Sequence, residues 1–272
     1  VQSAEVHYTV VRRRAWWWLS YNSYWNQGYI GTSSNDEEVA SGETVTAADG
    51  TFVVDIPMTM PPSPYPQFYN FVCTANVTDQ AGETHQAQLS LPLGNRKTAF
   101  SCDMAEKLLT EESPKLTFHL RNAAGIDINA AVRYRFDNGK WLTTNTQVPT
   151  PVAQMKSGKH TLEAICEQDT LKRDFVVFSL DDKRPAIETN DWSYQSATRF
   201  PNDGTPVTIQ VGSSDKDVHI VYTIIAGSQV LESGAVDKSN ELINRKLTYK
   251  EEYGDGILLN FIWVKKGVVY NH

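Results

Sequence analysis

The sequence predicts an all-β protein made of three tandem antiparallel β-sandwich domains. Three observations indicate this class: apolar residues recur at every second position, turn residues separate these runs, and wide apolar helical stripes are absent. Only the stretches 105–112 and 238–245 could hold short helices. Aromatic residues make up 11% of the chain, which suits the pleated faces of sheets.

The predicted strands share one alternating pattern. Each places one row of apolar side chains on a core and the other row toward solvent, as in half-buried antiparallel strands. The clearest runs are 6–10, 52–56, 116–121, 132–136, 207–211 and 220–224. Asp49-Gly50 and Asn138-Gly139 are the strongest hairpin signals, because these residue types tolerate positive φ.

Two changes in composition divide the chain into pieces of about 90 residues, the size of one small sandwich. The strand-like run 86–92 gives way to polar residues 94–97, and the run 174–180 gives way to the charged stretch 181–185. We therefore predict domains at 1–94, 95–182 and 183–272. The abrupt start at Val1 and the strand-like end at His272 lead us to expect an excised fragment of a longer protein.

Charge and hydropathy limit the partners of this segment. The 25 Lys and Arg against 32 Asp and Glu give a formal charge of −7, which disfavours nucleic-acid binding because phosphates need a basic surface. The longest apolar run, 256–264, is too short for a membrane helix of about 18–20 residues. We expect no nucleic-acid partner and no insertion of this segment into a membrane.

No pattern of residues predicts catalysis, a cofactor or a metal ion. The sequence has no nucleophile elbow around a serine, no H-E-x-x-H zinc motif and no glycine-rich phosphate loop. His7, His119 and His219 fall on the polar faces of predicted strands, where we expect them to meet solvent. We therefore predict that the chain is not an enzyme and that it binds no cofactor.

The three cysteines show no reactive spacing. Cys73, Cys102 and Cys166 form no C-x-x-C pair, so we expect small core thiols. Cys166-Glu167-Gln168 is one residue short of the C-x-E-Q spacing of an internal thioester and continues a strand pattern. We expect no thioester at this place.

The most unusual stretch is Arg12-Arg-Arg-Ala-Trp-Trp-Trp18, with Trp25 following. Trp16 and Trp18 would share one face of a strand and Trp17 would oppose them. Three interpretations stay open: packing within a core and between domains, docking of a protein, and stacking on sugars. Trp16, Trp17, Trp18 and Trp25 are therefore a candidate docking or sugar-stacking patch.

Several strand and turn segments in the first and last thirds of the chain have a familiar pattern: 6–14, 49–52, 71–84, 206–214, 218–224, 230–234, 249–256 and 261–267. These segments resemble the macroglobulin-type β-sandwiches of bacterial alpha-2-macroglobulin-like proteins, in the Bacteroidetes style. The last third is similar to the domain that leads toward the bait region, and the middle third carries the resemblance more weakly.

The resemblance implies macroglobulin or fibronectin-III-like domains that serve as a non-catalytic scaffold in an endopeptidase inhibitor. Such a protease trap collapses around its attacker after a bait segment is cut. The implied partners are neighbouring domains of the parent chain and, through the full-length parent, target proteases. The implied location is the periplasm, the cell envelope or the outside of the cell.

The sequence contains neither the C-x-E-Q motif of a thioester nor a long protease-sensitive bait insertion. The run Pro61-Pro-Ser-Pro-Tyr-Pro66 is expected to form a rigid extended loop. The alternative function is an adhesin or carbohydrate-binding array that uses the Trp-rich stretch.

Overall fold

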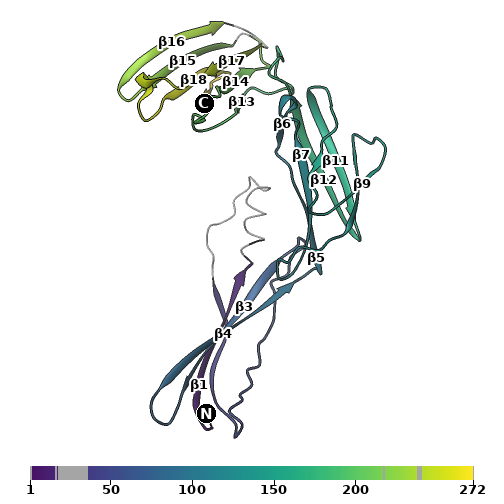
Figure 1. Cartoon of the computed structure of the whole chain (residues 1–272), viewed down its shortest axis with the longest axis vertical. Coiled ribbons are helices and arrows are strands. Elements are labelled where there is room, and N and C mark those ends of the chain that lie inside the picture. The colour runs from purple at the N-terminus through teal and green to yellow at the C-terminus, as the bar shows by residue number, and fades with distance from the viewer. Residues whose placement is uncertain (1, 16, 18–35, 217, 238–240, 272) are drawn as a thin grey trace.

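The computed structural model describes residues 2–15, 17, 36–216, 218–237 and 241–271. Strands dominate, and the predicted all-β class with antiparallel sheets is confirmed. Figure 1 shows three groups of strands that follow one another along a curved, elongated molecule, with the first and third groups at its two ends. Within the described ranges, no helix is long and apolar enough to cross a bilayer.

The first unit is an antiparallel sheet with the strand order β2-β1-β3-β4. Its strands are β1 (Glu5–Arg14), β2 (Glu37–Val45), β3 (Phe68–Thr78) and β4 (Thr84–Gly94). Val10, Tyr69 and Phe71 are buried on one face of this sheet. The segment 51–67 covers that face, with partly buried apolar side chains at Val54 and Ile56.

The predicted strand 52–56 is wrong as a strand, because the structure gives these residues no ladder. Its alternation is nevertheless real: Val54 and Ile56 pack on the core, whereas Val53 is 80% exposed. Apolar residues at every second position therefore indicate that one side of an extended chain is buried. They do not by themselves indicate pairing with a neighbouring strand.

The second unit packs a three-stranded sheet, β10-β7-β5, against a five-stranded sheet, β6-β12-β11-β8-β9. The strands are β5 (Thr98–Asp103), β6 (Lys107–Leu109), β7 (Lys115–Asn122), β8 (Ala131–Phe136), β9 (Leu142–Asn145), β10 (Thr150–Pro151), β11 (Gly158–Cys166) and β12 (Asp169–Phe178). Leu116, Phe118 and Leu120 of β7 face Leu162 of β11 and Phe175 of β12 in the core. The β6–β12 pair is parallel, in contrast to the antiparallel prediction.

The third unit packs the sheet β13-β14-β17 against the sheet β16-β15-β18-β19. The strands are β13 (Trp192–Gln195), β14 (Val207–Ser213), β15 (His219–Ala226), β16 (Gln229–Asp237), β17 (Glu241–Leu247), β18 (Leu258–Lys265) and β19 (Val268–Asn271). Val211, Ile220, Phe261 and Trp263 lie in the core between the sheets. The domain limits at 94/95 and 182/183 stay a prediction.

Local signals were partly misplaced. The stretch 105–112 forms β6 and a 3₁₀ turn, Thr110–Glu112, and residues 241–245 belong to β17, so neither stretch is the expected short helix. The hairpin signal at Asn138-Gly139 is off by one residue, because Asp137 and Asn138 hold the positive φ angles of 49° and 59°. Gly139 donates its backbone N–H to the Phe136 carbonyl at 2.8 Å and closes this turn.

His160 fastens the Asp137 turn to β11. Its Nδ1 lies 2.5 Å from Asp137 Oδ2, and its Nε2 lies 2.8 Å from the Lys156 carbonyl. Both partners only accept hydrogen bonds, so the imidazolium form satisfies both. Burial opposes the charge of each group, but these contacts prevail and raise the pKa of His160 above 6.5 while they lower the pKa of Asp137 below 3.8.

The stability of the second unit should therefore depend on pH. The raised pKa of His160 makes its contribution complete below pH 6.5, and the contribution is lost as the pH rises through the folded-state pKa. The lowered pKa of Asp137 makes its contribution complete above pH 3.8, and it is lost as the pH falls through the folded-state pKa. In denaturant unfolding, the wild type should lose stability as the pH rises from 6.5 through the folded-state pKa of His160, and His160→Asn should not show this loss.

The matched control is His85→Asn, since the side chain of His85 is 74% exposed. It should keep the wild-type pH profile above pH 6.5. If the stability of His160→Asn depended on pH as that of the wild type does, the stabilising role of the charged His160 would be contradicted.

Candidate functional site: two joints between the units

Trp17 lies where the first unit meets the second. It is 5% exposed, and its ring centroid lies 4.9 Å from that of Phe68, the first residue of β3. Ala15, Ala99 and Ala123 complete the apolar cluster around these rings. We call this set, together with Gly125, the first joint. Ala99 and Ala123 belong to the second unit, so the Trp17 ring is packed between the two units.

The first joint requires a glycine at position 125. A Cβ atom built there would lie 2.5 Å from Trp17 Cδ1, and the φ angle of Gly125 is +80°. Asn122 forms the turn that carries this glycine, because its side-chain Oδ1 accepts hydrogen bonds from the backbone N–H groups of Ala124 and Ile126, both at 3.0 Å. The turn thus presents bare backbone to the Trp17 ring.

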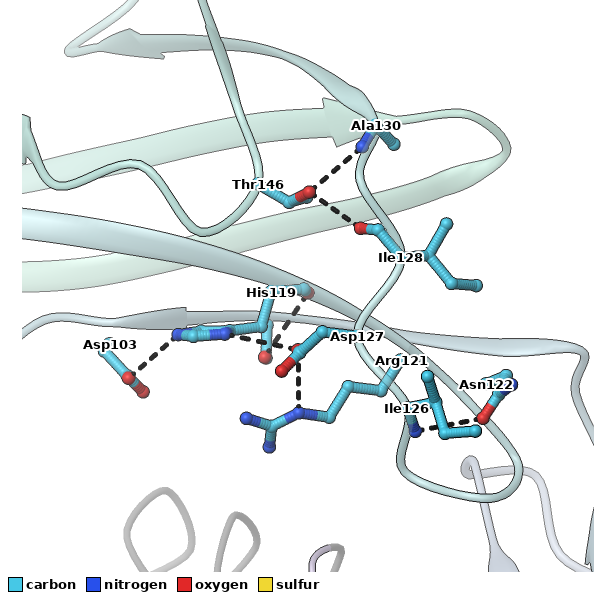
Figure 2. A network of polar contacts seen from close by, with 10 residues as sticks. Asp103, His119, Arg121, Asn122, Ile126, Asp127, Ile128, Ala130 and Thr146 are labelled. Carbon is cyan, nitrogen blue, oxygen red and sulfur yellow. Dashed lines mark hydrogen bonds and ion pairs between the residues drawn. The ribbon is translucent and has the colours of Figure 1, made fainter.

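A polar network holds the loop behind this turn, and Figure 2 shows it. Asp127 forms an ion pair with Arg121 at 3.0 Å and approaches His119 Nδ1 at 3.5 Å. His119 Nε2 lies 3.0 Å from Asp103 at the end of β5. The side chain of His119 is only 15% exposed, so the expectation of a solvent-facing histidine is wrong at this position.

Thr146 fixes the other end of the same loop. Its hydroxyl donates to the Ile128 carbonyl at 2.7 Å and accepts the backbone N–H of Ala130 at 3.0 Å. The loop 122–130 is therefore tied at both ends, and it delivers Gly125 to Trp17 as a pre-formed surface.

The second joint connects the second and third units through buried aromatic rings. Phe178 ends β12 and contacts two residues of β13: its ring centroid lies 5.4 Å from that of Trp192 and 4.7 Å from that of Tyr194. Phe178 and Trp192 are fully buried, and Leu109 of β6 packs beside them. We define the second joint as these four residues together with Lys107, Glu111, Glu112, Ser179 and Gln210.

Gln210 is the central polar residue of the second joint. It is fully buried on β14, its Oε1 accepts the Trp192 Nε1–H at 2.8 Å, and its Nε2 donates to the Ser179 carbonyl at 3.2 Å. One side chain thus binds both the linker and the strand that follows it. Buried amides of this kind are costly unless both ends are paired, which makes the geometry specific.

Charged groups brace the same joint. Lys107 Nζ donates to the Ser193 carbonyl at 2.6 Å and lies 4.7 Å from the centroid of the Trp192 ring, and burial lowers its pKa. Burial opposes the charge of Glu111, but hydrogen bonds from the Ser179 hydroxyl at 2.6 Å and the Leu180 N–H at 2.8 Å lower its pKa.

Tyr194 completes the bracing. It donates its hydroxyl to Glu112 at 3.0 Å, and burial together with this carboxylate raises the pKa of Tyr194. Packing and several hydrogen bonds therefore hold the second joint, and the first joint is built on the fit of one ring against alanines and a glycine.

The candidate aromatic patch is described only in part. Trp16, Trp18 and Trp25 lie outside the described residues, while Trp17 is buried in the first joint and does not present its ring to solvent. Sequence reasoning missed Gly125, Gln210 and Trp192. Gly125 closes an Asn-x-x-Gly turn, a signal that predicts the turn but not its partner.

The three cysteine thiols are closed off from solvent. Cys73, Cys102 and Cys166 are buried free thiols, and burial raises the pKa of Cys102 to about 12 and that of Cys166 to about 11. At neutral pH these groups are protonated and therefore poor nucleophiles. No group of three or more His, Cys, Asp or Glu side chains in the described ranges is arranged to hold a metal ion.

Comparison with known proteins finds similarity to solved structures only. No protein-family model and no curated protein sequence match the chain. The native conformation of Escherichia coli alpha-2-macroglobulin is 7% identical, with a TM-score of 0.35, and the match covers 100% of this chain and 20% of that one. Salmonella alpha-2-macroglobulin reacted with methylamine is 9% identical, with a TM-score of 0.31 and coverage of 98% and 20%.

A tetra-tandem repeat in the extending region of a large adhesion protein is 12% identical, with a TM-score of 0.22 and coverage of 100% and 66%. The chain spans about a fifth of the length of the E. coli and Salmonella alpha-2-macroglobulins that it matches. Similarity at these TM-scores carries no argument about function.

Substitution at Gly125 should loosen the first joint. Gly125→Ala adds a methyl group against the Trp17 ring and forces an L-residue to a φ of +80°. Gly82→Ala is the matched control, because Gly82 has a φ of +86° with nothing within 4 Å of the added Cβ. Both variants should lose about 1–2 kcal/mol of unfolding free energy from the backbone. Gly125→Ala should lose about 1–3 kcal/mol more from the clash.

Small-angle scattering should report a changed particle shape for Gly125→Ala and the wild-type shape for Gly82→Ala. Equal stability losses and equal scattering curves for the two variants would show that Trp17 does not set the geometry of the joint.

Removing the Trp192 Nε1–H donor should destabilise the protein at the second joint. Trp192→Phe keeps a ring beside Phe178 but leaves Gln210 Oε1 without its donor, which should cost about 1–3 kcal/mol in a denaturation experiment. Adding Gln210→Leu should cost less in the Trp192→Phe background than in the wild type, because the two side chains act on each other. Additive losses would contradict a coupled pair.

Proposed function

We propose that this chain is a non-catalytic scaffold segment of an alpha-2-macroglobulin-like endopeptidase inhibitor. The observation that carries the proposal is the contrast between the two joints. Hydrogen bonds from Lys107 to the Ser193 carbonyl, from Tyr194 to Glu112 and from Gln210 to the Ser179 carbonyl join the second and third units. The first unit packs on the second through the Trp17 ring, which is seated on a glycine turn.

This contrast suits a part that passes on a large rearrangement. The second and third units would move as one rigid arm, because rotating them apart would break the buried hydrogen bond from Gln210 to the Ser179 carbonyl and the bond from Lys107 to the Ser193 carbonyl. The first unit would change its angle by moving Trp17 on the Gly125 turn, where an aromatic ring packs on alanines and a glycine. Rigid-body rotation about such an interface is a common form of conformational switching.

The resemblance of segments such as 49–52, 71–84 and 261–267 to macroglobulin-type sandwiches supports the same proposal. Under it, the partners of this chain are neighbouring domains of the parent, and proteases are met only through the full-length parent. The location would be the periplasm or another part of the cell envelope. An adhesin or carbohydrate-binding array is the alternative, and three of its four candidate stacking residues, Trp16, Trp18 and Trp25, lie outside the described residues.

The proposal is tested on the full-length parent mixed with a broad endoprotease. A trap should migrate faster on a native gel after cleavage, and the bound protease should lose activity on a large substrate but keep it on a small one. The isolated 272 residues should leave both activities unchanged at stoichiometric concentration.

Gly125→Ala in the parent should slow the change in mobility, while Gly82→Ala should not. An unchanged mobility together with equal loss of both activities would overturn the trap. Binding of a polysaccharide by the same parent would then favour the adhesin.

A further inference from the structure

An open cavity of about 800 Å³ lies at the end of the third unit that faces away from the second joint. Two loops, 196–206 and 248–257, line it together with the first residues of β14. Val207 and Ile209 line the cavity, whereas Gly212 at the other end of the same strand pairs with Trp192 in the second joint. The cavity is thus directed away from the rest of the described chain.

The cavity has an apolar floor and an aromatic wall. Val207 and Ile209 are buried in the floor. Phe200 and Tyr249 form the wall, with ring centroids 5.8 Å apart, and the buried Tyr253 supports them from behind with its centroid 5.7 Å from that of Phe200. Tyr249 is 49% exposed and offers its ring to an incoming group.

Polar groups stand at the rim of the cavity. Arg199, Asn202 and Asp255 line it beside the rings. Apolar depth with a few polar rim groups suits a ligand that buries rings and leaves amides at the surface. Aromatic-lined grooves are the usual receptors of extended proline-rich peptides, since proline rings pack on aromatic faces.

The chain itself displays such a peptide. We call residues 61–66, Pro-Pro-Ser-Pro-Tyr-Pro, the proline segment. Its residues 61, 62, 64 and 65 are exposed, and Tyr65 is 72% exposed. Proline fixes its own φ near −65° and restricts the preceding residue to extended conformations, so the segment has little freedom to lose on binding.

Asn95, directly after β4, and Ser63 brace the segment. Asn95 donates its side-chain amide to the Tyr65 carbonyl at 2.9 Å and accepts the Gln67 N–H at 2.9 Å. The Ser63 hydroxyl accepts the Tyr65 N–H at 3.2 Å. These bonds fix the backbone at Tyr65 and Gln67 while the Tyr65 side chain stays exposed, so the segment is a pre-organised ligand with a lower cost of docking.

We propose that the proline segment of one copy of this chain docks into the aromatic cavity of a second copy. The segment leads into Phe68 beside the first joint, whereas the cavity lies at the end of the third unit away from the second joint. The second unit separates the two in one copy, so the contact joins different copies (Figure 1). Such a contact is heterologous, because the segment and the cavity are different surfaces and each copy can use both at once. Assembly would therefore grow head to tail with concentration.

Complementary variants test the proposal. The segment variant Pro61→Ala/Pro64→Ala keeps an intact cavity, and the cavity variant Tyr249→Ala keeps an intact segment. Sedimentation over about a hundredfold range of concentration should show wild-type mass that rises, while each variant alone should associate about tenfold more weakly. An equimolar mixture of the two variants should form a one-to-one complex that grows no further.

Asn202→Arg is a second cavity variant, which blocks the exposed rim without removing a packed ring, and it should behave like Tyr249→Ala. Leu89→Ala, an exposed apolar residue on β4, is the matched control and should associate like the wild type. A labelled peptide of residues 58–68 should bind the wild type and fail to bind Tyr249→Ala.

Three results would overturn the proposal. They are a wild type that stays monomeric across the whole range, variants that associate as strongly as the wild type, and a mixture that forms no one-to-one complex. The docking does not depend on membership in a protease trap, so failure of one leaves the other standing.

Discussion

The hydrogen bond from Gln210 to the Ser179 carbonyl is the buried polar contact that ties the third unit to the end of the second. Gln210 is fully buried, yet it binds a residue of β13 with one end and the linker carbonyl of Ser179 with the other. Because an unpaired amide at this depth is costly, small shifts of the third unit against the second are penalised at once. The aromatic contacts of Phe178 then follow from that fixed geometry.

The first joint obeys a different constraint, which is steric. Trp17 needs bare backbone opposite its ring, and the Asn122 turn supplies Gly125 with the required φ. The network of His119, Asp127 and Thr146 keeps that turn in place from behind. One molecule thus combines a joint fixed by directional bonds with a joint fixed by shape, and the two differ in what a rotation would break.

Much of the fold could be predicted from alternation, because strands such as β7 and β8 bury one face and solvate the other. The alternation of apolar residues predicts less where a segment packs without strand pairing or where a neighbouring unit buries the second face of a strand. The segment 51–67 alternates without a ladder, and β14 is buried on both faces because the second joint covers its outer side. Gln210 therefore looked like a solvent-facing strand residue. The joints could not be predicted, since each unites residues far apart in sequence that carry no shared local signal.

The burial of the three cysteine thiols limits how the folded chain reacts with oxidants. Cys73, Cys102 and Cys166 lie inside sheets, and the raised pKa values of Cys102 and Cys166 leave little thiolate at neutral pH. Thiolate is the species that oxidants and disulfide exchange partners attack, so the folded chain resists both. It can keep reduced cysteines in an oxidising compartment and still fold without a crosslink, which frees its units from the covalent tethers that would otherwise limit their motion.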